Sequence, residues 1–253
     1  MTKLYLALAT LALVATPTAA HDPATLDAFV AGSTKDCPGC DLSGLNLTYR
    51  DLSEGNLAGA NLTKARLHRA ILTRVNLTGA NLAEANFNLA DLRFADLTGA
   101  DLTGTLFYEA NLAASKLDNA TMVGAKVQHA QLARASMTGV VWTGSDATGV
   151  YLVGANLTGA DISDVYAPAS DLRQTNLTGA NLSDSTFYQA NFASADLTGA
   201  VIERADLRQT RLNNAIFINA VVADSKFAQA WTQGADFSNV DTTTASGLSI
   251  RSK

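Results

Sequence analysis

The stretch NLTGANLAEANFNLADLRFADLTGADL, residues 76–102, repeats a five-residue pattern in which a large apolar residue follows Asn or Asp. These apolar residues recur at every fifth position from Leu77 to Leu102. A period of five fits neither the 3.6-residue period of a helix nor the two-residue period of a strand. The backbone must therefore turn a corner in every pentad, with one large and one small side chain pointing inward.

The same register continues without a slip from Leu42 to Phe237, which makes forty pentads. A small residue, most often alanine, stands two positions before each central residue, except for Leu45 and Arg50 in the first coil. Such regularity predicts a repeat rod in which each unit packs only on its neighbours. The central positions without a large apolar side chain are Ala147, Ala167 and Thr232.

A second period of twenty residues indicates how many pentads form one coil. The block that begins at Asn76 recurs at Asp96, Asn156, Asn176 and Asp196, and all the offsets are multiples of twenty. Four pentads per coil give about ten coils, and a strand spacing of about 4.8 Å predicts a rod roughly 48 Å long. Glycine recurs at the fourth pentad position on one face, which predicts type II turns there, because their third residue has positive φ.

The pattern Ala-Asp/Asn-Leu-x-x, seen in residues 80–84 and 100–104, resembles the pentapeptide repeat family. The resemblance extends from Cys40 to about Asn239. It implies an all-β fold, a right-handed quadrilateral β-helix with the central Leu or Phe and the preceding Ala inside. Membership of this family implies an architecture but no single activity.

Four segments are expected along the chain. Residues 1–20 resemble a secretory signal, with Lys3 before an apolar run and small residues at the cleavage site, so a periplasmic or secreted protein starting near His21 is predicted. Residues 21–39 form an N-terminal cap, with a short helix from Asp22 as N-cap to Ala31. The β-helix occupies 40–239 and a C-terminal cap or tail 240–253. After signal removal no transmembrane segment is expected.

The lone pair Cys37 and Cys40 predicts a disulfide that joins the cap to the first coil, since exported proteins meet an oxidising compartment. A redox site, a zinc site and a haem attachment are the alternatives. Each needs a sequence context that is missing here, namely a βαβ unit, a second ligand pair or a following His.

Basic residues gather in one coil and form the first candidate interaction surface, for an anionic glycan, lipid headgroup or phosphate. The competing interpretation is a solvated face that discourages aggregation. The residues are Lys64, Arg66, His68, Arg69 and Arg74.

Three outward tyrosines, Tyr108, Tyr166 and Tyr188, lie on the face that carries the stacked phenylalanines and form the second candidate surface. Exposed aromatic rings can stack on sugars or on a partner protein. Simple packing between coils is the alternative.

No enzyme is expected, and no cofactor or metal. The three histidines are scattered, and the Asp residues before the central positions belong to the repeat. An enzyme would need a hidden pocket near Pro168, where Ala147 and Ala167 are expected to leave the coils under-filled.

The favoured hypothesis is a non-enzymatic scaffold that binds an unknown protein or glycan of the envelope or extracellular space, with its oligomeric state undetermined. The alternative, implied by the family, is a DNA-mimicking modulator of a topoisomerase. The net charge of −5 is only mildly acidic, so nucleic-acid binding is not expected and mimicry of DNA is weakly supported.

Overall fold

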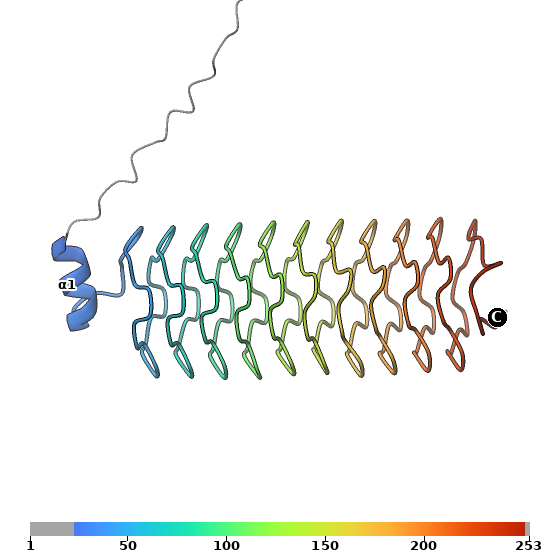
Figure 1. The fold of residues 1–253 in the computed structure, drawn as a ribbon, viewed down its shortest axis with the longest axis horizontal. Helices are drawn as coiled ribbons and strands as arrows, with labels where there is room; N and C mark the ends of the chain where they lie inside the picture. Colours follow the sequence, from blue (N-terminus) through green and yellow to red (C-terminus); the bar gives the residue numbers. More distant parts are fainter. Residues whose placement is uncertain (1–22, 251–253) are drawn as a thin grey trace, which may run out of the picture.

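The computed structural model describes residues 23–250, which form a rod with one helix at its N-terminal end (Figure 1). Helix α1 spans Pro23–Ala31, as predicted. The predicted signal segment, residues 1–20, and the predicted N-cap Asp22 lie outside the described residues, as do residues 251–253.

Residues twenty apart pair in parallel along the whole rod, which confirms the predicted coil of four pentads. Asn61 pairs with Asn81, and the Leu62 amide donates to the Asn81 carbonyl at 2.7 Å. The Asn81 amide in turn donates to the Ala60 carbonyl at 2.9 Å. Each pairing is an isolated bridge, because the chain turns again within the same pentad. The right-handed sense of the coil stays a prediction of the family resemblance.

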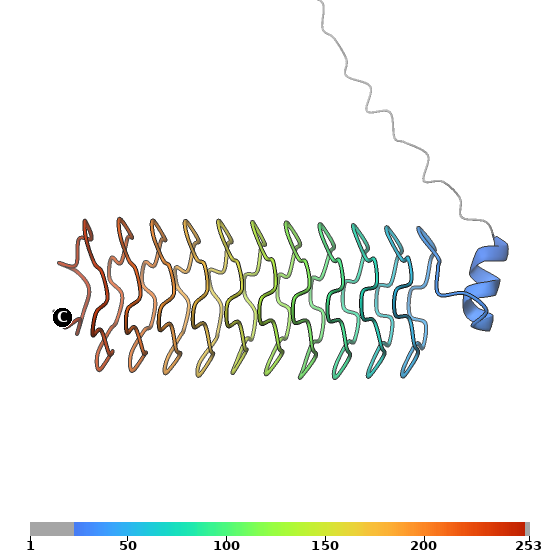
Figure 2. The ribbon, with the colours of Figure 1, turned by 180° about the vertical axis from the view of Figure 1, so that it is seen from behind.

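The rod has four faces, which we number by their central residues in the first coil: Leu42, Leu47, Leu52 and Leu57. Every twentieth residue belongs to the same face, and a corner follows each face. Figure 2 shows the same coils from behind, without an inserted loop in residues 40–240. The surface is therefore made of straight columns of residues spaced twenty apart.

The core consists of the central side chains and the small residues that precede them. Central residues such as Leu62, Leu132 and Phe107 are fully buried, and so is Ala65. The rings of Phe87 and Phe107 stack with centroids 5.2 Å apart, as expected for neighbouring coils. Each buried central side chain contributes about 1.5 to 3 kcal/mol of transfer free energy, largely offset by chain ordering.

Positive φ occurs at all four corners and is not restricted to the glycine-bearing face. Gly59 has φ 65°, and the Ala60 amide closes the turn by donating to the Leu57 carbonyl at 3.1 Å. Non-glycine corner residues do the same, such as Glu54 at 61° and Lys64 at 58°. The ladder between coils holds these residues in a conformation that side chains usually avoid.

The expectation of under-filled coils is met beside Ala167. Trp142 is buried in the same region and lines a small apolar cavity of about 10 Å³ together with Ala167 and Phe187. Its indole Nε1 has no hydrogen-bond partner among the described residues. The volume of this apolar cavity is far below that of a substrate pocket.

Helix α1 covers the N-terminal end of the core. Phe29 is fully buried, and the Arg50 guanidinium lies 4.3 Å from the centre of its ring and donates to its carbonyl. Arg50 stands at a pentad position that a small residue occupies elsewhere, and here its side chain joins helix α1 to the first coils. Partial burial lowers the pKa of its guanidinium. The predicted disulfide links Cys37 and Cys40, which are both buried with Cα atoms 5.4 Å apart.

Residues 240–250 cover the C-terminal end and extend the ladder by one bridge. Ser246 pairs in parallel with Lys226. Val240, Ala245 and Leu248 pack against the core while remaining partly exposed. The predicted tail is thus ordered on the last coil as far as residue 250.

Candidate functional site

The structure places most of the predicted basic residues around the second face, within one coil. Arg66 lies on this face, and Lys64 and Arg69 occupy the corners on either side of it. Arg74 lies one corner further round the rod. The predicted cluster is therefore split between two sides of the molecule.

Neighbouring coils supply partners for these basic groups. Lys64 lies 3.6 Å from the Glu84 carboxylate. Arg74 lies 3.9 Å from Glu54, and its guanidinium is 5.4 Å from the centre of the Phe94 ring. These acidic groups weaken the basic cluster as an anion site, since its charges are shared with ion pairs.

The three predicted tyrosines lie on the second face but do not form one patch. Tyr108 and Tyr166 are 44% and 53% exposed. Hydrogen bonding to Glu109 raises the pKa of Tyr108. Tyr188 is half-buried, and its hydroxyl donates to the side-chain oxygen of Gln209 at 2.9 Å. Of the three tyrosines, Tyr188 is the one that bonds to Gln209, which lines a groove along the neighbouring corner.

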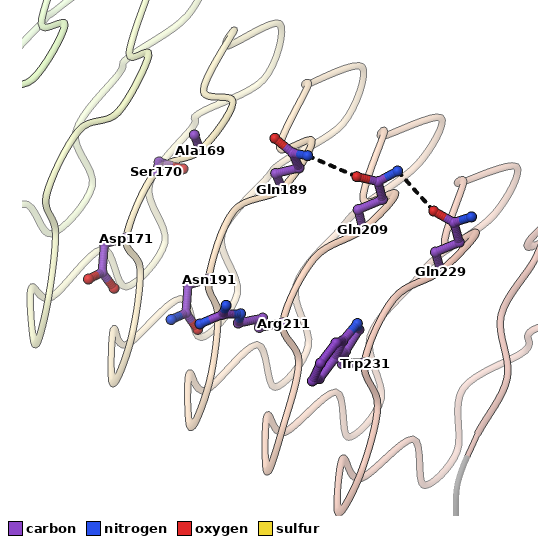
Figure 3. A pocket seen from close by; sticks show the side chains of 9 residues that line it. All are labelled: Ala169, Ser170, Asp171, Gln189, Asn191, Gln209, Arg211, Gln229 and Trp231. Carbon is purple, nitrogen blue, oxygen red and sulfur yellow. Dashed lines mark hydrogen bonds between the residues drawn. The ribbon is translucent and has the colours of Figure 1, made fainter.

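A groove of about 540 Å³ runs along the corner between the second and third faces. Figure 3 shows its two walls, which follow two columns of residues along the rod. One wall belongs to the second corner and the other to the edge of the third face. The lining residues are Ala169, Ser170, Asp171, Gln189, Asn191, Gln209, Arg211, Gln229 and Trp231.

A ladder of three glutamines forms the corner wall. The Gln189 side-chain nitrogen donates to the Gln209 oxygen at 2.9 Å, and the Gln209 nitrogen donates to the Gln229 oxygen at 2.8 Å. All three have positive φ, between 59° and 64°. This conformation and the twenty-residue spacing place the amides in a row along the axis (Figure 3).

The opposite wall carries one chemically different side chain per coil. Asp171, Asn191, Arg211 and Trp231 follow one another through parallel bridges between successive coils. Asp171 is held by Arg173, with Nη2 to Oδ2 at 2.8 Å, and this contact raises the pKa of Arg173. Arg211 is exposed and forms no ion pair with another described residue. The wall thus offers an amide, a cation and an aromatic ring.

Trp231 is the most prominent feature of the groove, because 64% of its surface is exposed. A second hollow lies on its other side, lined by Asn213, Thr232 and Gln233 among others. Both flanks of the indole are therefore bordered by amide side chains. Large exposed aromatics rimmed by polar groups are typical of binding surfaces.

Neither a cluster of metal ligands nor a membrane-spanning helix occurs in the described part of the chain. Within residues 23–250, no group of three or more His, Cys, Asp or Glu side chains could hold a metal ion. The one helix in that range is too short to cross a bilayer. The Asp and Asn side chains before the central residues instead accept hydrogen bonds from their own turns, as Asn76 does from Thr78 at 3.1 Å.

Comparison with known protein families matches the chain to pentapeptide repeats, in eight copies that cover more than half of it: residues 40–79, 70–107, 128–164 and 169–204. The chain belongs to the pentapeptide repeat family. The predicted resemblance is thereby confirmed, and with it the β-helix.

Several solved structures are similar to this pentapeptide repeat protein. HetL, a protein involved in heterocyst differentiation regulation from the cyanobacterium Nostoc sp. strain PCC 7120, shares 29% identity over 89% of this chain and 97% of its own, with a TM-score of 0.41. A trypsin-treated form of QnrB1, a plasmid-mediated fluoroquinolone resistance protein, shares 16% identity over 78% of this chain and 89% of its own, with a TM-score of 0.42. A pentapeptide repeat protein from the Arabidopsis thaliana thylakoid lumen shares 32% identity over 47% of this chain and 70% of its own, with a TM-score of 0.26. No curated protein matches the chain.

The glutamine ladder and Trp231 were missed in the reasoning from sequence, although a signal for the ladder exists. Gln189, Gln209 and Gln229 are spaced by twenty residues, so writing the pentapeptide repeat protein in rows of twenty aligns them. Trp231 shows no such repetition. Its importance follows only from its exposure beside the ladder.

Proposed function

We propose that this pentapeptide repeat protein is an exported, non-enzymatic rod that binds a partner of the cell envelope or extracellular space. The groove along its side carries the proposal. It combines an exposed indole, a row of amides and a guanidinium on a backbone that is tied to itself in every coil. Such a rigid surface can bind a partner without losing much conformational freedom.

Two further observations support binding rather than catalysis. Pentapeptide repeat proteins are generally non-enzymatic. The cavity inside the rod, beside Ala167, is a mainly apolar space of about 10 Å³, and its lining contains no carboxylate, histidine, lysine or cysteine for acid–base chemistry. Export is supported by the signal-like residues 1–20.

The electrostatics favour this proposal over mimicry of DNA. Nine carboxylates lie in ion pairs with Lys or Arg, including Asp184 with Arg204 at 2.7 Å and Asp206 with Arg208 at 2.6 Å. A DNA mimic must present an extended array of negative charge. Here nine of the 23 Asp and Glu side chains lie beside a Lys or Arg, which interrupts any extended array of negative charge.

The test is fractionation of the native organism followed by intact-mass measurement and binding to isolated envelopes. We expect protein that begins near His21, with Cys37 and Cys40 oxidised, in the periplasmic or culture fraction. The purified rod should sediment with envelope material. A full-length cytosolic product that inhibits topoisomerase supercoiling would instead establish the alternative function.

A further inference from the structure

We infer that the groove between the glutamine ladder and Trp231 is a binding site for a linear oligosaccharide. This inference rests on the proposed function as a partner-binding rod and names the chemistry of the partner. It follows from the aromatic platform, the row of amides, the balance of charge and the regular spacing of the walls.

Trp231 supplies a platform for the face of a sugar ring. Its indole is 64% exposed and forms a boundary of both the groove and the hollow beyond it. Pyranose rings have an apolar face of C–H groups that can pack on an aromatic ring, while their hydroxyls point sideways. Amide side chains border the indole, with Gln229 lining the groove and Asn213 and Gln233 lining the hollow beyond it.

The glutamine ladder leaves hydrogen-bonding capacity facing the groove. A primary amide has two N–H donors and two acceptor lone pairs. The Gln209 oxygen is fully used, because it accepts from Gln189 and from the Tyr188 hydroxyl, both at 2.9 Å. Its nitrogen uses only one hydrogen, in the bond to Gln229. Gln189 directs its second N–H to the Tyr188 hydroxyl at 3.4 Å, but the remaining N–H groups of Gln209 and Gln229 suit hydroxyls, which both donate and accept.

The charge of the groove disfavours a nucleic acid. The negative charge of Asp171 is balanced by its ion pair with Arg173. Among the residues that line the groove, Arg211 is the one cation, and it makes no ion pair with a described residue. Binding of a polyanion requires many phosphate-neutralising cations. One guanidinium is sufficient for a hydroxyl pair or for a single carboxylate on an acidic sugar.

The periodicity of the groove suits an extended polymer. Asp171, Asn191, Arg211 and Trp231 succeed one another once per coil, at the strand spacing of about 4.8 Å. The ladder has the same spacing on the other side (Figure 3). A linear chain that lies along the rod axis therefore meets polar side chains on both walls at the coils of Asn191 and Arg211, and an amide opposite the indole at the coil of Trp231.

The experiment measures binding of short cellulose, chitin and polygalacturonate oligosaccharides to the full mature protein. Tryptophan fluorescence is informative, because acrylamide quenches exposed Trp231 and not buried Trp142. We expect at least one oligosaccharide to protect Trp231 from quenching and to give a measurable heat by titration calorimetry. A single-stranded oligonucleotide should do neither.

Variants locate the site. Trp231→Ala should weaken oligosaccharide binding about tenfold or more in calorimetry. Arg211→Gln should weaken the polygalacturonate probe more than the neutral probes. Gln209→Gly removes a ladder amide at a position where glycine relieves positive φ, so a loss of affinity in this variant is not a folding defect.

Tyr49→Ala is the matched control. Tyr49 is 63% exposed and lies on the same corner as the ladder, but at the other end of the rod. The Tyr49→Ala variant should bind the oligosaccharides with the same affinity as the unchanged protein. The inference is overturned if none of the three probes binds, if Trp231→Ala binds as tightly as the unchanged protein, or if the oligonucleotide binds in the groove. Envelope binding that persists in Trp231→Ala would overturn the sugar site and leave the proposed function intact.

Discussion

The hydroxyl of Tyr188 donates a hydrogen bond to the side-chain oxygen of Gln209, 2.9 Å away in the next coil. Tyr188 was predicted from the sequence as part of an interaction surface, whereas the glutamine ladder was not predicted. The bond connects the two. Gln189, the next residue in the same coil as Tyr188, donates to the same oxygen at 2.9 Å. The second face and the groove are therefore one connected polar surface.

Tyr188→Phe should loosen this connection without disturbing the core. Because the half-buried bond to Gln209 and the longer bond accepted from Gln189 at 3.4 Å are lost, the free energy of unfolding should fall by about 0.5 to 1 kcal/mol in urea titrations. Tyr166→Phe is the control, since the Tyr166 hydroxyl has no hydrogen-bond partner among the described residues. Equal effects of the two changes would show that the bond to Gln209 contributes nothing.

Gly99→Ala tests the cost of positive φ at a corner. Gly99 has φ 65°, and an added Cβ would meet no atom within 4 Å, so any loss comes from the backbone alone. We expect the unfolding free energy to fall by about 1 to 2 kcal/mol. The reciprocal change Ala114→Gly, at φ 57°, should be neutral or stabilising.

Gly55→Ala should also destabilise the protein, but through a steric clash and not through positive φ. Gly55 lacks positive φ, but its Cβ would lie 2.6 Å from the Lys35 carbonyl oxygen. The backbone of the N-terminal cap would have to shift, so a larger loss than at Gly99 is expected. A smaller loss at Gly55 would mean that the cap adjusts freely.

Ala167→Val should fill the small cavity that Ala167 shares with Trp142. We expect a gain in unfolding free energy of about 0.5 to 1 kcal/mol, from added apolar burial. Leu132→Ala, in a fully packed coil, should instead cost about 2 to 5 kcal/mol. Destabilisation by Ala167→Val would show that the neighbouring side chains already use the space.

The ion pairs predict how stability depends on pH. Bidentate hydrogen bonds from Arg208 lower the pKa of Asp206, and Arg93 does the same for Asp91. A carboxyl whose pKa is lower in the folded state stabilises fully above its unfolded pKa of about 3.9. This contribution is lost as pH falls through the folded pKa.

Urea titrations at pH values between 7 and 2.5 measure this dependence. Arg208→Gln and Arg93→Gln should reduce the difference in unfolding free energy between pH 5 and pH 3. Arg134→Gln is the control, because Arg134 forms no ion pair with a described residue. An unchanged pH profile in all three variants would contradict a role for these pairs in acid stability.

Much of the fold could be predicted because the repeat is local. Large apolar residues that recur every fifth position from Leu42 to Phe237, with three exceptions, have only one way to remain buried. The twenty-residue recurrence shows which pentads lie next to each other in neighbouring coils. The short helix α1, Pro23–Ala31, was also predicted from its residues. The predicted positive φ on the glycine-bearing face agrees with Gly59, and the structure adds that non-glycine corners such as Glu54 and Lys64 share it, because the ladder between coils overrides the preference of each corner residue.

The candidate site was predicted only in part, and the reason is physical. The sequence determined by itself which side chains point outward and which columns they occupy, since the pentad fixes the direction of every residue. The tertiary structure decided which outward groups contact each other: that Gln189, Gln209 and Gln229 join in a ladder, that Asp171 is held by Arg173, and that Trp231 remains exposed. Those outcomes depend on side-chain rotamers across coils, where several partners lie within reach and only packing in three dimensions selects among them.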